Sequence, residues 1–305
     1  LFLRSINIQF MQQKSVLKSI LWVSLFILPF SLAAQVLSPE QFLGYKVGTR
    51  FTRHHQIVNY FTAIAAAKSD MVKLIPYGKT NEGRDLMVAA IGTAENIKNL
   101  EQIRKHNLGL VEGTVQDLNQ PGIVWLSYNV HGNEPASSEA AMLTLFALVD
   151  PNNNETKNWL KNTVVMIDPC INPDGRDRYV NFYQQYGNAP ADIHKFSAEH
   201  KEPWPSGRPN HYLFDLNRDW AWMTQIESEQ RVQRYNQWLP HVHVDFHEQG
   251  INEPYYFPPA AEPYHEVITN WQRDFQKQIG ANHASYFDKE GWLYFSKEIF
   301  DLLYP

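Results

Sequence analysis

The sequence is poor in several features that mark common classes of protein. Cys170 is the only cysteine among 305 residues, so no disulfide can form within the chain. It follows a strand of buried character, which favours a small core residue over a reactive thiol. There is no run of lysine or arginine, and the formal net charge is −5. That balance argues against a nucleic-acid partner.

An apolar stretch near the beginning predicts export. Residues 1–10 precede Met11 and resemble upstream read-through; from Met11 a basic start leads into the apolar stretch Ile20–Leu32 and a small-residue cleavage region, 31–34. The stretch is short for a membrane span, although an uncleaved anchor is the alternative. Cleavage near Ala34 removes three basic residues and no acidic one, which changes the net charge to −8. We expect a periplasmic or extracellular protein without stable membrane insertion after cleavage.

The remaining residues, 35–305, predict one large α/β domain. The whole chain is 44% apolar and 19% charged, and it contains no internal repeat, low-complexity segment or evident linker. Strand patterns alternate with helical ones. The expected strands are Leu86–Ile91, Ile123–Val130, Val164–Asp168 and His241–Phe246. The expected helices are His54–Lys68, Ala94–His106, Pro135–Val149, Gln225–Trp238 and Glu262–Tyr286. Tyr179–Pro209 is expected to be a long loop that borders a cleft or has no role.

A short motif between a predicted strand and a predicted helix suggests a metal site. His131 and Glu134 occupy the turn in His131-Gly-Asn-Glu134, and His247 ends a second strand. Open α/β sheets place ligands at the carboxyl ends of their strands. Two imidazoles and a carboxylate can hold one zinc ion and leave a fourth position for water. The motif alone is weak, because both residue types are common at helix starts.

Further segments strengthen this interpretation because they occur in a characteristic order. They are Gly78–Arg84, His131–Glu134, Asn172-Pro-Asp-Gly175, Asp215-Leu-Asn-Arg218 and His247. Together they resemble the zinc carboxypeptidase family, the funnelins, and most closely a secreted bacterial branch. The resemblance covers the chain from about Tyr45 to its end. It implies a mixed, mostly parallel twisted sheet flanked by helices.

The resemblance also implies roles for individual residues. His131, Glu134 and His247 match the zinc ligands, and Asp215 matches the outer carboxylate that orients the first histidine. Asn217 and Arg218 match the pair that holds the substrate's terminal carboxylate, for which the planar guanidinium of arginine is well suited. Arg208 is the candidate that stabilises the oxyanion, with Arg176 and Arg178 as competitors.

The sequence departs from the family in one important respect. The family's general base is a glutamate on a late strand, several dozen residues after the third zinc ligand, and only 58 residues follow His247. Glu290 and Glu298 do not stand where the base is expected. We therefore expect a domain that is incomplete at the C-terminus, with the base beyond Pro305, and a fragment that is inactive alone. Asn133 also replaces the arginine of many relatives.

Three rival interpretations compete with this one. In the first, His241-x-His243-x-Asp245-x-His247 nearly matches the pattern of metallo-β-lactamase-like hydrolases, but Phe246 separates the last two residues. His241 and His243 are thus more simply packed or hydrogen-bonded histidines. The second is a zinc-dependent deacylase of acylated amino acids, and the third is a non-catalytic, secreted zinc-holding binding protein. The leading hypothesis is a metallocarboxypeptidase that acts on peptide or protein C-termini, with zinc-activated water as the nucleophile.

Overall fold

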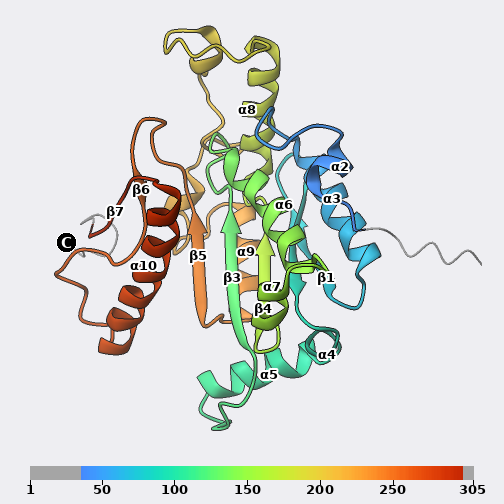
Figure 1. Ribbon diagram of the computed structural model, residues 1–305, viewed down its shortest axis with the longest axis vertical. Helices are drawn as coiled ribbons and strands as arrows, with labels where there is room; N and C mark the ends of the chain where they lie inside the picture. Colours follow the sequence, from blue (N-terminus) through green and yellow to red (C-terminus); the bar gives the residue numbers. More distant parts are fainter. Residues whose placement is uncertain (1–35, 298–305) are drawn as a thin grey trace, which may run out of the picture.

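The computed structural model describes residues 36–297, which form a central sheet covered by helices on both faces (Figure 1). The predicted upstream segment and signal peptide, residues 1–34, lie outside the described residues. After the first two strands, which follow each other directly, the strands of this sheet alternate with helices along the chain. The predicted fold class is therefore confirmed.

The central sheet has five strands in the order β1-β2-β4-β3-β5. These are β1 (Val72–Lys79), β2 (Asp85–Ile91), β4 (Thr163–Asp168), β3 (Gly122–Tyr128) and β5 (Val242–Phe246). The β1–β2 and β2–β4 pairs are antiparallel, whereas β4–β3 and β3–β5 are parallel. Four of the five strands therefore run in one direction, in agreement with the mixed, mostly parallel sheet that was expected. A small second sheet pairs β6 (Tyr255–Tyr256) with β7 (Tyr294–Phe295).

Helices connect these strands and cover the sheet. They are α2 (Pro39–Leu43), α3 (His54–Ala67), α4 (Ala94–Lys98), α5 (Leu100–Val111), α6 (Ala136–Val149), α7 (Asn154–Trp159), α8 (Pro173–Tyr186), α9 (Ile226–Asn236) and α10 (Asn270–Glu290). Two single turns, η1 (Ala198–His200) and η2 (Leu216–Arg218), are 3₁₀ helices. Every expected strand and helix has a counterpart among these elements, although several bounds differ. The expected single helix Ala94–His106 is two helices, α4 and α5, separated at Asn99.

The differences have physical causes. β1 was not predicted, because Pro76 and Gly78 interrupt its pattern and it is a half-exposed edge strand. The expected loop Tyr179–Pro209 begins inside α8, which runs to Tyr186, so that part of the expectation is wrong. The expected helix Glu262–Tyr286 begins only at Asn270, where Thr269 caps the first turn, and it ends at Glu290 before Gly291.

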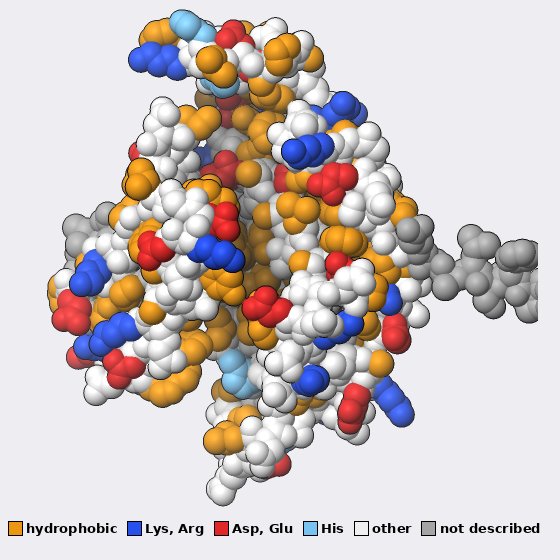
Figure 2. Space-filling view, in the orientation of Figure 1, with side chains coloured by type: hydrophobic (Ala, Val, Ile, Leu, Met, Phe, Trp, Pro, Cys, Tyr) orange, Lys and Arg blue, Asp and Glu red, His pale blue; other side chains and the backbone are white. Residues whose placement is uncertain are grey.

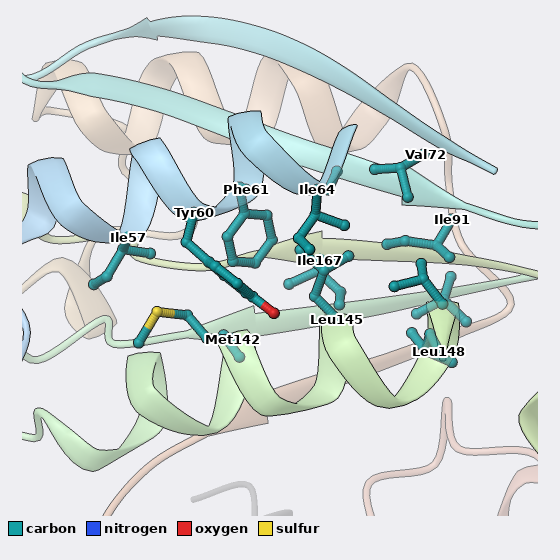
Figure 3. Close-up of a cluster of buried hydrophobic side chains, with 14 of the residues drawn as sticks. Ile57, Tyr60, Phe61, Ile64, Val72, Ile91, Met142, Leu145, Leu148 and Ile167 are labelled. Atoms are coloured by element: carbon teal, nitrogen blue, oxygen red, sulfur yellow. The ribbon is translucent and has the colours of Figure 1, made fainter. Parts of the chain in front are cut away.

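Alternation along the strands divides the core into two layers. Met87, Ala89 and Ile91 of β2 belong to a cluster with α3 and α6. Figure 3 shows Ile91 in this cluster. Val88 and Ala90 face the other side, with Trp125 and the α5 side chains. The alternation follows from the two-residue period of a strand. Because both layers are packed, the sheet forms a rigid base from which the loops at its ends project.

The carboxyl ends of β3 and β5 carry the predicted metal ligands. The two strands are neighbours, run parallel and pair from Val124–Val242 to Tyr128–Phe246. His131 therefore follows β3, and His247 follows β5, at the same edge of the sheet. α6 begins at Ala136, directly after the turn that contains Glu134. The topology thus brings three residues from distant parts of the sequence to one place.

A buried carboxylate beneath the sheet edge should make stability depend on pH. Asp168, the last residue of β4, is fully buried and accepts a hydrogen bond from Tyr77 Oη at 2.8 Å. Burial raises the pKa of Asp168 to about 7 from 3.8, although Tyr77 and the nearby Arg231 oppose the shift. A raised acid pKa in the folded state favours folding at low pH. The contribution of Asp168 to the free energy of unfolding is fully present below pH 3.8, and it is lost as the pH rises through about 7.

Asp168→Asn should remove that dependence, because asparagine keeps an acceptor for Tyr77 and does not ionise. Between pH 5 and pH 7.5 the free energy of unfolding of the wild type should fall by about 2 kcal/mol more than that of the variant. Urea denaturation at both pH values measures the difference. Asp70→Asn, at an exposed position, is the control and should follow the wild type. Parallel pH profiles for the wild type and Asp168→Asn would contradict the prediction.

Candidate metal centre

Three predicted ligands converge at the end of β3 and β5. His131 Nδ1 lies 2.7 Å from Glu134 Oε1, and His247 Nδ1 lies 3.3 Å from His131 Nδ1 and 3.4 Å from Glu134 Oε2. One ligand atom from each residue lies within 4.8 Å of the others. The side chain of His131 is 4% exposed, Glu134 is 14% exposed and His247 is 30% exposed. The group is therefore anchored in the fold on one side and open to solvent on the other.

The donor set and its spacing fit a zinc ion. Ligand atoms about 2.1 Å from a tetrahedral zinc lie roughly 3.4 Å from one another. The distances from His247 Nδ1 to the other two ligands match that separation, whereas His131 Nδ1 and Glu134 Oε1 lie closer, at the 2.7 Å of a hydrogen bond. Both histidines present Nδ1 toward the common point, so their Nε2 atoms are left for outer partners. Three protein ligands with an open side are typical of catalytic zinc sites.

An outer carboxylate contacts each ligand imidazole. His131 Nε2 lies 3.1 Å from Asp215 Oδ1, and His247 Nε2 lies 3.0 Å from Asp245 Oδ2. Such contacts fix the ring orientation and the tautomer of a ligand histidine. Asp215 was a candidate for this position from the sequence. Asp245 was considered only as part of the alternating histidine pattern, although its spacing two residues before His247 places both on one face of the strand.

Glu134 and His247 are charged near neutral pH when no metal is bound. Burial opposes the ionisation of Glu134, but hydrogen bonds from His131 and His247 outweigh it and lower the pKa of Glu134 to about 2. Burial also disfavours the charged form of His247, but its hydrogen bonds to Asp245 and Glu134 raise the pKa of His247 to about 10. A metal that binds here must therefore displace a proton from His247.

Arg208 lies beside the ligands. Its Nε and Nη2 atoms donate to Asp215 Oδ2 at 3.2 and 3.0 Å, and its Nη1 lies 3.6 Å from Glu134 Oε1. The Arg208 side chain is 43% exposed, so it borders the open side of the group. The two competing arginines, Arg176 and Arg178, do not border the open side. Arg176 is fully buried, and Arg178 donates to the carbonyl oxygens of the loop at 206–210.

Asn217 and Arg218 follow Asp215 in the single turn η2. Asp215 caps this turn, because its Oδ1 accepts the backbone N–H of Asn217 at 2.9 Å. Arg218 is exposed, and its Nη1 donates to the carbonyl oxygen of Asn217 at 3.2 Å. The turn places both side chains close along the chain to the outer carboxylate of His131. They are thereby available for a ligand that enters from solvent.

Three glycines allow the motif segments to approach one another. A Cβ atom at Gly132 would clash with the backbone of Gly175 and with the carbonyl oxygen of Gly207. A Cβ at Gly175 would clash with the same oxygen. The segments that contain His131, Asn172 and Arg208 therefore meet backbone to backbone, which requires glycine at these positions.

The Gly78–Arg84 segment has a supporting role. Arg84 donates to Asp174 Oδ1 and Asp177 Oδ2, both at 2.8 Å, and Thr80 Oγ1 donates to Asp174 at 2.6 Å. These contacts connect the β1–β2 turn to α8. Asn133, which replaces an arginine of many relatives, donates to Glu202 Oε2 at 3.0 Å. It therefore attaches the ligand turn to the loop that precedes Arg208.

His241, which directly precedes β5, and His243 within β5 have partners other than the metal ligands. His241 Nδ1 accepts the backbone N–H of Ile123 at 3.0 Å, and His243 Nε2 lies 2.9 Å from Ser127 Oγ. Both contacts join β5 to β3. This agrees with the expectation of packed or hydrogen-bonded histidines.

The surface around the group is uneven. Figure 2 shows a hollow between the α10 segment and the α6 side of the sheet, with acidic side chains along part of it. Glu248, which was not a candidate, follows His247, and its Oε1 accepts the backbone N–H of Ala136 at 2.6 Å.

Within residues 36–297, no helix is both long and apolar enough to cross a membrane.

Comparisons with known proteins point to one family. The family model described as "Zinc carboxypeptidase" matches residues 57–291. Carboxypeptidase 2 of Trichophyton equinum is 23% identical over 206 residues, which are 67% of this chain and 30% of that protein. Probable carboxypeptidase 2 of Arthroderma benhamiae is 26% identical over 125 residues, 41% of this chain and 18% of that protein. The chain thus spans less than a third of the length of these relatives.

A solved structure shows the same fold. Carboxypeptidase A of Helicoverpa armigera superposes with a TM-score of 0.57 at 17% identity, over 99% of this chain and 72% of that one. At that identity the likeness concerns the fold alone. Together with the family match, it places the three converging ligands within a scaffold of known type.

Proposed function

The chain belongs to the zinc carboxypeptidase family, and on that premise we propose that it is an exported metallocarboxypeptidase. One zinc ion would be held by His131, Glu134 and His247, and the substrates would be peptide or protein C-termini. The observation that carries the proposal is the convergence of these three ligands within 4.8 Å at one edge of the sheet. When bound, zinc supplies polarisation of the scissile carbonyl and a water of lowered pKa.

Residues around the metal position would orient its ligands and stabilise the charge that develops during the reaction. Asp215 and Asp245 hold the two imidazoles by their Nε2 atoms, so that each Nδ1 faces the metal position. Arg208 borders the open side and would stabilise negative charge on the carbonyl oxygen as the tetrahedral intermediate forms. Its contact with Asp215 keeps the guanidinium in place before substrate arrives. Preorganisation of this kind lowers the barrier more than it tightens substrate binding.

Arg218 and Asn217 would recognise the free carboxylate of the substrate. Arg218 is exposed, and its Nη1 donates to the backbone carbonyl of Asn217. The remaining in-plane N–H groups of its guanidinium could donate two parallel hydrogen bonds to a carboxylate. Glu248 we assign to holding the end of β5 against α6 and not to proton transfer, because its carboxylate already accepts the Ala136 N–H.

A peptide digest tests the proposal. The protein, produced from its complete gene, is incubated with a mixed peptide pool, with and without a chelator, and the products are identified by mass spectrometry. Loss of single C-terminal residues that stops with chelator and in His131→Ala is the expected result. An untouched pool with hydrolysis of acylated amino acids would indicate a deacylase instead. No hydrolysis of either, with zinc still bound, would indicate a zinc-holding binding protein.

Export is the other part of the proposal, and the sequence of residues 11–34 supports it. N-terminal sequencing of protein recovered from the periplasm or the medium should begin close to Gln35. Recovery only in the cytoplasm with residues 11–34 intact would contradict it.

Arg218→Ala should discriminate between peptides by their C-termini. For peptides with a free carboxylate, kcat/KM should fall about 10- to 100-fold, the value of losing a hydrogen-bonded charge pair. For the same peptides with an amidated C-terminus, whatever slow cleavage occurs should not change. Arg104→Ala, on α5, is the control and should behave as the wild type. Equal losses on both peptide types would remove Arg218 from the carboxylate role.

A further inference from the structure

We propose that Asn129 is a positioning residue that holds the turn carrying two of the metal ligands. Asn129 follows the last residue of β3 by one position, and it is fully buried. The inference rests on the proposed function, because it concerns the zinc affinity of the group formed by His131, Glu134 and His247. Neither the sequence pattern nor the family comparison assigned it a role.

The Asn129 amide clamps the turn from inside. Its Nδ2 atom donates to the backbone carbonyl oxygens of His131 at 2.7 Å and of Glu134 at 2.8 Å. The N–H of Glu134 also donates to the carbonyl of His131 at 3.1 Å. One side chain thus fixes the backbone of both ligand residues relative to each other. Their side chains then meet, with His131 Nδ1 2.7 Å from Glu134 Oε1.

Three donors fix the orientation of this amide. Asn129 Oδ1 accepts from Arg176 Nη1 at 3.0 Å, from Ser138 Oγ at 3.1 Å and from Cys170 Sγ at 3.4 Å. A guanidinium only donates, so the atom that faces Arg176 must be the oxygen. Both hydrogens of Nδ2 are thereby directed at the turn. The arrangement also accounts for Cys170, whose thiol is a buried donor.

The backbone of Asn129 is specialised as well. Its φ is 60°, in the left-handed region, where asparagine is several-fold enriched among residues other than glycine. Its carbonyl oxygen accepts the N–H of Asn172 at 3.1 Å, which extends the contact between the chain after β3 and the chain after β4. Asparagine therefore combines the bend in the chain with a side chain that donates two hydrogen bonds.

The chain contains a matched control. Asn107 of α5 is 6% exposed, and its Nδ2 donates to the carbonyl oxygens of Trp238 at 2.6 Å and Leu239 at 2.9 Å. Asn107 thus makes the same pair of hydrogen bonds to two backbone carbonyl oxygens as Asn129 does. α5 lies at the opposite end of the sheet from the carboxyl ends of β3 and β5 (Figure 1). Loss of this clamp should affect stability without reaching the ligands.

The test compares zinc affinity with stability in four variants. Asn129→Asp keeps the shape but turns a carboxylate oxygen toward two carbonyls, and Asn129→Gly keeps the left-handed backbone but removes the amide. Zinc Kd is measured by competition with a chromophoric chelator, and Tm is measured on metal-free protein. Asn129→Asp should weaken zinc binding about 10- to 100-fold, as outer partners of metal ligands do. Asn129→Gly should also weaken it, whereas Asn107→Asp should lower Tm and leave the Kd unchanged.

The outcomes separate the inference from the function beneath it. If folded Asn129→Asp and Asn129→Gly bind zinc as the wild type does, or if Asn107→Asp weakens zinc equally, the positioning role is overturned while the zinc site stands. If His131→Ala, the fourth variant, keeps the wild-type Kd, the zinc assignment itself is overturned, and the inference falls with it. Weaker zinc binding in both Asn129 variants, with an unchanged Kd in Asn107→Asp, supports the positioning role.

Discussion

His131→Ala or His247→Ala should abolish tight zinc binding. Each substitution removes one of three protein ligands, and the remaining pair would also lose the geometry that the third ligand imposes. Dialysis against sub-micromolar zinc followed by metal analysis should give close to one zinc per wild-type chain and almost none per variant chain. Stoichiometric zinc in both variants would show that the metal, if any, is held elsewhere.

The histidines of β5 provide the controls for this experiment. His241→Ala, directly before β5, and His243→Ala, within it, remove imidazoles that contact Ile123 and Ser127 of β3 instead. Both variants should keep their zinc. If His243→Ala lost the metal while Glu134→Ala retained it, the ligands would instead follow the alternating pattern of metallo-β-lactamase-like hydrolases.

Zinc should also stabilise the wild type against heat. A ligand that binds only the folded state raises the free energy of unfolding by about 2.7 kcal/mol at a concentration 100 times its Kd. In His131→Ala, zinc should cause no such increase over the Tm of the same variant without metal. A zinc-dependent rise in Tm that survives this substitution would contradict the assignment.

The sequence was sufficient to predict those parts of the fold that depend on local pattern. Buried strands such as β2 and β3 are continuous apolar runs between turn residues, and the helices between them have clear periodicity. The order of the motifs then indicated which chain segments meet. β1 was missed because an edge strand with Pro76 and Gly78 lacks such a pattern.

The missed site residues are defined by long-range contacts. Asn129 has no distinguishing sequence pattern, because its partners Arg176 and Cys170 lie more than 40 positions away. The contact between Asp245 and His247 is local in the sequence. Its role beside a metal ligand becomes evident only when the fold brings His247 next to His131. Arg176 was considered as an oxyanion residue from its place after the Asn172–Gly175 turn. The structure instead directs it into the core beneath that turn.

Arg176 stabilises the turn that contains His131 and Glu134. We expect its replacement to be the most destabilising change within the core. The side chain is fully buried and pairs with Glu139 Oε1 at 2.8 Å. It also donates to the carbonyl oxygens of Thr52 at 3.0 Å and Pro135 at 2.8 Å, and to Asn129. Every guanidinium nitrogen is therefore satisfied. Removal would leave the buried Glu139 carboxylate without its opposite charge, and the carbonyl oxygens of Thr52 and Pro135 would lose this donor.

Arg176→Met should thus reduce the free energy of unfolding by about 3–5 kcal/mol, the usual cost of breaking a buried ion pair by removing one member. The double variant Arg176→Met/Glu139→Gln should cost less than the sum of the two single variants, with a coupling of about 0.5–3 kcal/mol, because the uncompensated charge is gone. Glutamine can still accept from the Thr52 N–H, which Glu139 Oε1 now binds at 2.6 Å. Urea denaturation of metal-free protein measures these values without a contribution from zinc.

Arg231 provides the matched comparison, since it is equally buried but differently held. It is 1% exposed and stacks on Trp220 at 3.6 Å from the ring centroid, and within residues 36–297 its guanidinium nitrogens have no hydrogen-bond partner. Arg231→Met should therefore cost less than Arg176→Met, because no hydrogen-bonded acceptor is left unpaired. Equal costs for the two, with additive effects of the Arg176 and Glu139 substitutions, would show that burial of a large side chain outweighs the hydrogen-bonded ion pair. The turn that carries His131 and Glu134 would then depend on packing and not on the Arg176 network.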